Sequence, residues 1–129
     1  MDKGQRALDA IRNIALAQAD VKRLSKDLQS ALHGCNGVKG RFEYSGEDGK
    51  WKDGDDVTHL HIAYEPVAID GEFDYLTDSE IREELAICPA CLCAHDLIQQ
   101  RKAAKRRLAT ARMRITMIGR GILKQEKAA

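Results

Sequence analysis

The sequence predicts an α+β fold that is mainly α. Two long helices form an antiparallel coiled-coil hairpin, and the segment between them forms a small inserted head with a β-hairpin and a short helix. Three observations predict this fold. Apolar residues recur every seven positions towards both ends of the chain, the middle part loses that period, and Gly and Asp gather in the middle part. We expect a single domain over residues 1–129, with an acidic α+β insertion at residues 38–87.

The first long helix is predicted over residues 2–33. This segment has no proline, and its apolar positions form two heptad rows, the second of which is mostly alanine. Small side chains in that row would let a partner helix approach closely. Gly34 and Gly37 follow, and either can take the left-handed conformation that ends a helix. The rows are Ala7, Ile14, Val21 and Leu28, and Ala10, Ala17, Leu24 and Ala31.

The second long helix is predicted over residues 89–122. Pro89 suits a first helical turn, because its missing N–H would have no partner there. Gly119 and Gly121 weaken the far end. Two apolar rows again recur every seven residues, so we expect this helix to pair with the first. The rows are Leu97, Ala104, Ala111 and Ile118, and Leu108, Ile115 and Ile122.

The insertion between the helices shows strand-like alternation. Residues 38–45 and 57–64 are predicted strands, joined by a Gly- and Asp-rich turn or loop over residues 46–56. A third short strand is expected at residues 67–69, with a turn at Asp70 and Gly71. Residues 77–80 have the form of a capping box, which predicts a short helix reaching residue 87.

Charge is strongly segregated along the chain, although the net charge is only +1. Residues 40–87 contain fourteen acidic and four basic residues, a net charge of −10. Residues 96–129 contain ten basic and two acidic residues, a net charge of +8. The acidic middle and the basic tail must therefore pair with each other or each face a different partner.

Cysteines mark the two ends of the insertion. Cys88 and Cys91 form a Cys-x2-Cys knuckle at the start of the second helix, and Cys35 follows the first helix. An antiparallel hairpin brings these three thiols to one end of the helix pair. Clustered cysteines in a reducing compartment are typical metal ligands, so the sequence predicts a structural Zn²⁺ site that closes the hairpin.

The fourth ligand of this site is expected to be His95, one turn after Cys91, with Cys93 and His33 as alternatives. Three thiolates and one imidazole would complete a tetrahedral shell, which is typical of a structural zinc ion. Two other interpretations stay open. The thiols can pack together without metal, or Cys88 and Cys91 can form a redox pair, although the βαβ pattern of a disulfide oxidoreductase is missing.

Several further residues are candidates for contacts. His59 and His61 have a spacing that metals use on a strand, but solvent-facing strand positions explain the pair equally well. An exposed Trp51 would anchor a protein contact, or it folds back onto a small core. The candidate protein-contact residues of the acidic insertion are Trp51, Asp53, Asp55 and Asp56.

The basic positions of the second helix are candidates for contact with nucleic acid or a protein partner. Closely spaced cations can follow a phosphate backbone, whereas a solvated outer helix face explains the same pattern without a ligand. The acidic insertion could instead dock on a basic surface of another protein. The candidate basic residues are Arg101, Lys102, Lys105, Arg106, Arg107, Arg112 and Arg114.

Catalysis and membrane insertion are not expected. The sequence has no Gly-rich phosphate loop, no His-Glu-x-x-His and no nucleophile elbow, so no catalytic residue is assigned. Its start is charged, and no apolar run approaches the ~18 residues that a bilayer-spanning helix needs. We therefore expect a cytoplasmic, non-enzymatic protein with another protein as its main partner, and self-pairing of the heptad helices as a further option.

The stretch from Cys88 to His95, together with residues 101–104, 107–109 and 115–120, resembles the C-terminal part of small, uncharacterised, Cys-containing proteins encoded by bacteriophages. The similarity covers about a quarter of the chain. The resemblance implies an accessory or inhibitor protein acting on a host protein in a bacterial cytoplasm. It implies no catalytic residues.

Overall fold

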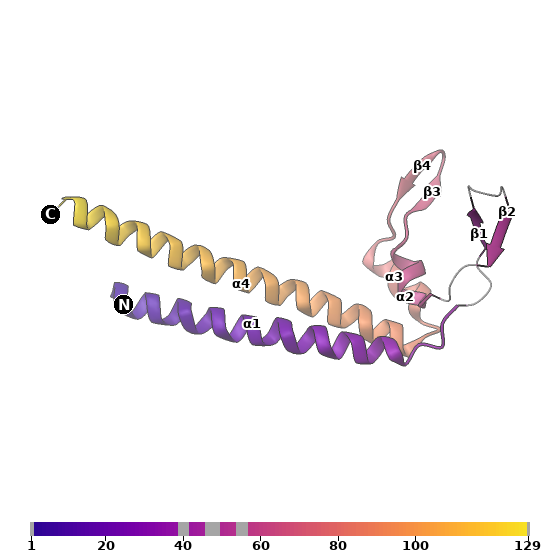
Figure 1. Ribbon diagram of the computed structural model, residues 1–129, viewed down its shortest axis with the longest axis horizontal. Helices are drawn as coiled ribbons and strands as arrows, with labels where there is room; N and C mark the ends of the chain where they lie inside the picture. Colours follow the sequence, from indigo (N-terminus) through magenta and orange to yellow (C-terminus); the bar gives the residue numbers. More distant parts are fainter. Residues whose placement is uncertain (1, 39–41, 46–49, 54–56, 129) are drawn as a thin grey trace. The chain divides into compact units, whose positions relative to one another are not determined.

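A computed structural model describes residues 2–38, 42–45, 50–53 and 57–128 (Figure 1). The fold is mainly helical and divides into two compact units. We call residues 1–27 and 97–129 the paired-helix unit, and residues 28–96 the cysteine unit.

The two long helices are α1, Lys3–His33, and α4, Pro89–Ala128. Their starts agree closely with the predicted bounds, but α4 continues through Gly119 and Gly121 to residue 128 instead of ending near 122. The glycines lower helix propensity by about 1 kcal/mol each, which is too little to stop a helix of 40 residues. None of the described helices combines the length and apolar composition that crossing a bilayer requires.

In the paired-helix unit, α1 and α4 lie side by side (Figure 1). Arg107 donates a hydrogen bond to Asp20 at 3.1 Å, and Arg101 donates one to Ser25 at 3.4 Å, so the contacts run in opposite directions along the two helices. The buried side chains belong mainly to the predicted alanine positions, which confirms that small residues mediate this contact. They are Ala10, Ala17, Leu24, Ala104 and Ala111.

In its described residues, the cysteine unit contains two separate two-stranded antiparallel sheets and two short helices. The third predicted strand and its turn are confirmed: Asp70 has φ 52° and Gly71 has φ 81°, as a tight turn between antiparallel strands requires. The elements are β1 (Phe42–Ser45), β2 (Lys50–Asp53), α2 (His59–Tyr64), β3 (Val67–Ile69), β4 (Glu72–Asp74) and α3 (Asp78–Leu85).

The strand predicted over residues 57–64 is wrong, because residues 59–64 form α2. Thr58 caps this helix by accepting a hydrogen bond from the His61 N–H at 3.1 Å. Leu60 and Ala63, three residues apart, are both buried, which is a helical spacing. Local capping and this spacing outweigh the alternating pattern from which a strand was expected.

The pairing of the first strand also differs from expectation. β1 pairs with β2, which lies in the segment predicted to be a turn or loop, and the register places Phe42 opposite Asp53. Val57 makes only an isolated bridge with Val38. A short hairpin therefore forms earlier in the insertion than the apolar alternation indicated.

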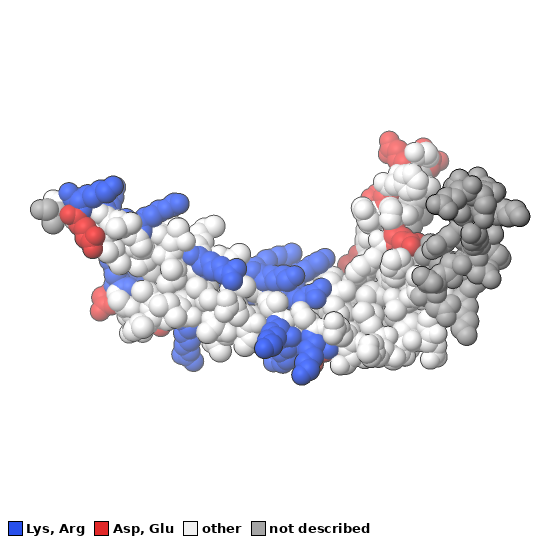
Figure 2. All heavy atoms as spheres, viewed as in Figure 1, with Lys and Arg blue, Asp and Glu red and all other residues white. Residues whose placement is uncertain are grey.

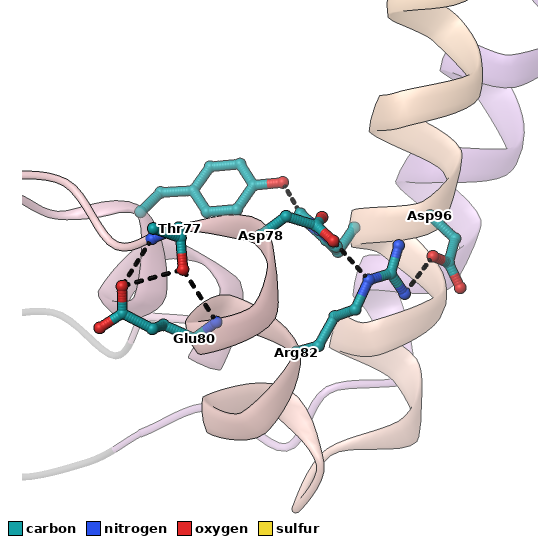
Figure 3. A network of polar contacts seen from close by, with 7 residues as sticks. Thr77, Asp78, Glu80, Arg82 and Asp96 are labelled. Carbon is teal, nitrogen blue, oxygen red and sulfur yellow. Dashed lines mark hydrogen bonds and ion pairs between the residues drawn. The ribbon is translucent and has the colours of Figure 1, made fainter.

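The predicted capping box at the start of α3 is confirmed (Figure 3). The Thr77 side chain accepts from the Glu80 N–H, and the Glu80 carboxylate accepts from the Thr77 N–H at 3.1 Å. Both interactions satisfy backbone donors at the helix start. The helix ends at Leu85, whose side chain is completely buried.

Candidate metal site

Four side chains of the cysteine unit meet at one point: Cys35, His59, Cys88 and Cys91. Each offers one ligand atom, and these atoms all lie within 4.8 Å of one another. Cys88 and Cys91 are buried, whereas Cys35 and His59 are half-buried. Three sulfurs and one imidazole nitrogen at this spacing can hold a metal ion.

Cys35 is held by the turn that follows α1. Its backbone N–H donates to the Leu32 carbonyl at 3.1 Å, and its Sγ accepts from the Gly37 N–H at 3.4 Å. Gly37 has φ 80°, a conformation that favours glycine. At Gly34, a Cβ atom would lie 3.2 Å from that of Ala90, so this glycine allows the end of α1 to approach the start of α4.

Cys88 immediately precedes α4, and Cys91 lies in its first turn. The Cys88 N–H donates to the Leu85 carbonyl at 2.9 Å, and the Cys88 carbonyl accepts from the Leu92 N–H at 3.0 Å. The first bond ties the knuckle to the end of α3, and the second begins the hydrogen bonding of α4. Residues three apart are neighbours on a helical turn, so both sulfurs reach the same side.

His59, the first residue of α2, completes the group. Its Nδ1 lies 3.3 Å from Cys35 Sγ. In a tetrahedral zinc site with Zn–S near 2.3 Å and Zn–N near 2.0 Å, the edge between sulfur and nitrogen is about 3.5 Å. The Cys35–His59 pair therefore already has the separation of two ligands of one ion.

The thiols of this group differ in acidity. Burial opposes ionisation of Cys35, but hydrogen bonds from the backbone N–H groups of His59 and Gly37 lower its pKa to about 6. Burial, together with the neighbouring Cys35 and Cys88, raises the pKa of Cys91 to about 12. Because a second buried thiolate beside the first is costly, a cation is needed to ionise the whole group.

The predicted cysteines Cys35, Cys88 and Cys91 do come together, but the expected fourth ligand differs. His95 is only 1% exposed, and both of its ring nitrogens are engaged elsewhere. Its Nδ1 lies 2.6 Å from the Tyr64 hydroxyl, and its Nε2 lies 2.7 Å from an Asp78 carboxylate oxygen.

The two alternative fourth ligands, Cys93 and His33, are exposed and lie outside the cluster. The fourth member of the cluster is His59. The sequence pattern indicated His59 only together with His61, as a possible metal-binding pair on a strand. On the helix the two histidines diverge: His61 lies 3.2 Å from Glu65 instead. The sequence pointed to His59 only through its residue type. Its position at the start of a helix was not predicted, because residues 57–64 were expected to form a strand.

His95 belongs to a polar network with Tyr64 and Asp78, whose members Asp78, Arg82 and Asp96 are labelled in Figure 3. Asp78 accepts from His95 and from Arg82 Nε at 2.9 Å, and Arg82 also reaches Asp96 at 2.8 Å. Hydrogen bonds from His95, and secondly from Arg82, lower the pKa of Asp78. Because Tyr64 is on α2, Asp78 on α3 and His95 on α4, the network joins the helix carrying His59 to the helix carrying Cys91.

The predicted contact residues lie elsewhere. Trp51 and Asp53 are in β2, whereas Asp55 and Asp56 lie outside the described residues. Lys and Arg side chains are spread along the paired helices (Figure 2). Six of the seven predicted basic residues are exposed, and Arg101 is half-buried beside Ser25. One of these basic residues, Arg107, makes an ion pair with Asp20 of α1.

Comparisons with known proteins identify no relative. No protein-family model matches the chain, and neither a search of curated proteins nor a search of solved structures finds a similar one.

Proposed function

We propose that this chain is a non-enzymatic protein-interaction module in which one structural Zn²⁺ closes an antiparallel helical hairpin. The observation that supports it most is the group of Cys35, His59, Cys88 and Cys91. Three thiolates and one imidazole fill a tetrahedral shell, so a bound ion would keep no open position for a substrate. Such an ion stabilises a fold and does not catalyse a reaction.

The ligand chemistry favours zinc over other abundant cations. Mg²⁺ and Ca²⁺ prefer oxygen ligands, whereas thiolate and imidazole suit Zn²⁺. The ligands are also distant in sequence, because Cys35, His59 and Cys88 are separated by more than twenty residues each. Binding one ion would therefore order the intervening chain.

Exposed apolar side chains and segregated charges on the surface support an interaction role. Large apolar side chains are exposed in both units, among them Met113 at 65% and Phe73 at 75%. The charges are segregated rather than mixed, which favours contacts with partners of opposite charge. The resemblance to bacteriophage accessory proteins suggests a bacterial host protein as the partner.

The zinc part of this proposal is tested by elemental analysis of the purified protein. We expect one zinc per chain, lost in Cys91→Ser and retained in Cys93→Ser. The second variant is a matched control, because it makes the same chemical change at an exposed cysteine outside the cluster. Zinc-free wild-type protein, or equal zinc content in the two variants, would contradict the proposal.

The interaction part is tested with the zinc-loaded chain as bait in a bacterial lysate, quantified by mass spectrometry. We expect a defined protein to be enriched with wild type and Cys93→Ser and to be lost with Cys91→Ser. Binding of the purified candidate must then be reproduced by calorimetry. Enrichment that does not depend on Cys91, or none above empty beads, would argue against a metal-ordered interaction module.

A second function is favoured by one observation, the exposed basic side chains of α4 (Figure 2). We propose as the alternative that these residues bind the phosphate backbone of nucleic acid. The logarithm of the affinity for random duplex DNA should then fall steeply with the logarithm of salt concentration. Charge reversal at Lys102, Lys105 and Arg106 should flatten that slope. Absence of DNA binding at low salt would remove this alternative.

A further inference from the structure

A groove lies along the paired-helix unit, between residues of α1 and α4. One cavity of about 700 Å³ and a second of about 430 Å³ both use Asn13 and Arg114 as lining residues, so they adjoin. Along α1 the lining residues extend from position 6 to position 20, which at 1.5 Å per residue is about 20 Å. The groove is long enough for a segment of protein rather than for one side chain.

The groove has apolar walls with cationic groups among them. Ala10, Met117 and Ile118 supply apolar surface to the larger cavity. Arg6, Arg12 and Arg114 line the same cavity, and within the described part of the chain these three guanidinium groups make no ion pair.

The larger cavity also contains one carboxylate. Asp9 lines it and accepts a hydrogen bond from the Gln5 side chain at 3.1 Å. Three arginines against this single acidic group give the cavity a net positive charge, so it suits an apolar group accompanied by carboxylates.

The β3–β4 hairpin of the cysteine unit has the complementary chemistry. Phe73 is 75% exposed on one face of β4, and Tyr75, the residue that follows β4, is 69% exposed. The register places Ala68 opposite Phe73, so this face is apolar on both strands. Solvated aromatics on a short hairpin are a contact surface without a described partner.

Carboxylates neighbour the aromatic residues along the hairpin, and those of β4 alternate with Phe73 onto the opposite face. Asp70 is in the turn, and Glu72 and Asp74 belong to β4, in which every residue is exposed. Neither Asp70 nor Glu72 makes an ion pair within the described residues. The hairpin therefore carries aromatic rings accompanied by acidic groups, the chemistry that the arginine-lined cavity accepts.

The net charges of the two units indicate which surface of a second copy would bind to this groove. The paired-helix unit has sixteen basic and five acidic residues, a net charge of +11, and the cysteine unit has five basic and fifteen acidic residues, a net charge of −10. Two paired-helix units repel each other, whereas the paired-helix unit of one copy attracts the cysteine unit of another. A second copy of this chain therefore supplies a complementary surface.

We propose that the chain self-associates by binding the β3–β4 hairpin of one copy in the arginine-lined groove of a second copy. The rings of Phe73 and Tyr75 contact the apolar wall at Met117 and stack on guanidinium groups. The hairpin carboxylates pair with the groove arginines. The contact uses none of the four metal-site residues, although the hairpin belongs to the cysteine unit, which the metal is expected to order. The association goes beyond the proposed interaction with another protein.

The test uses two variants of the full-length, zinc-loaded chain and size-exclusion chromatography with light scattering. The groove variant carries Arg6→Glu, Arg12→Glu and Arg114→Glu, and the hairpin variant carries Phe73→Ala and Tyr75→Ala. Wild type should have at least the mass of a dimer, and each variant should associate at least tenfold more weakly. All of the changed residues are exposed, so circular dichroism should show unchanged helix content.

Mixing the two variants is the decisive step. The groove variant keeps its hairpin and the hairpin variant keeps its groove, so an equimolar mixture should form a complex that neither variant forms alone. A control variant with Lys102→Glu, Arg106→Glu and Arg120→Glu changes the charge equally but lies outside both cavities, and it should retain more of the association.

Three results would overturn the proposal. Wild type could remain monomeric at 100 µM, the groove and hairpin variants could associate as strongly as wild type, or their mixture could fail to recombine. The last two results would place any self-association on another surface, such as the apolar faces of the long helices.

Discussion

The paired-helix unit buries mostly alanines, whereas the cysteine unit buries Leu85, Cys88, Cys91 and His95. In the first unit, larger apolar residues remain on the surface, including Leu8 at 62% exposure and Met117 at 63%. In the second unit, polar and sulfur-containing groups converge in its interior. The same chain thus combines a contact built from many small side chains with one built from a few specific groups.

This difference predicts different responses to change. Each alanine of the paired-helix unit contributes a small apolar area, so no single contact decides its stability. In the cysteine unit, loss of one metal ligand weakens the metal binding that orders the fold. Loss of one hydrogen-bond partner leaves a buried polar group unsatisfied, which costs the desolvation free energy of that group.

Removing metal should unfold the cysteine unit but not the paired helices. A structural zinc site contributes on the order of 10 kcal/mol to folding. So small a unit cannot lose that much free energy of folding and stay folded. After chelation, hydrogen exchange measured by mass spectrometry should accelerate throughout residues 59–91 while residues 10–24 keep their protection. Equal loss of protection in both units would show that they depend on each other for folding.

Replacing His95 by alanine should lower the free energy of unfolding by about 3 kcal/mol, since it leaves a cavity and removes one hydrogen bond each from Asp78 and Tyr64. Urea denaturation of the zinc-loaded protein measures the loss. The control is His33→Ala, because His33 is exposed and lies outside the network. Similar effects of the two changes would contradict the role given to the network.

Enlarging one alanine of the helix contact should have a moderate effect. Ala111 is 1% exposed, so Ala111→Leu forces extra volume into a closely packed site and should cost about 1 to 3 kcal/mol. Ala109→Leu adds the same side chain at an exposed position and should change the stability by less than about 0.5 kcal/mol. Thermal unfolding of both variants would detect the difference, and its absence would mean that the contact is loose.

The smallest effect is expected at the start of α3. Thr77→Ala removes a helix cap and should cost about 1 kcal/mol. Hydrogen bonds from the backbone N–H and the side chain of Thr77 lower the pKa of Glu80 below its ordinary value of 4.5. Losing the hydroxyl should raise this pKa part of the way back, which carboxyl NMR titration can follow. An unchanged pKa would show that the hydroxyl does not contribute.

Much of the helical architecture was predictable because it depends on local patterns. Heptad rows, the position of Pro89 and the capping box at Thr77 each specify a structure within one or two turns. The convergence of Cys35 with Cys88 and Cys91 followed from expecting antiparallel helices. These features need no knowledge of distant contacts beyond that pairing.

The fourth member of the cluster was not predictable in the same way. Residues 57–64 alternate like a strand, so the helical position of His59 depends on the Thr58 cap and on burial of Leu60. His95 has the right spacing from Cys91, yet Asp78 and Tyr64 occupy both of its nitrogens. Only the tertiary structure shows which histidine faces the sulfurs.

The most direct test of the central claim, that Cys35, His59, Cys88 and Cys91 hold one metal ion, is the absorption spectrum of the Co²⁺-substituted protein. We expect one equivalent of Co²⁺ to give the spectrum of a tetrahedral site with three sulfur ligands. This spectrum should change in His59→Ala and remain the same in His95→Gln. A spectrum that changes with His95 but not with His59, or no tetrahedral spectrum at all, would contradict the account.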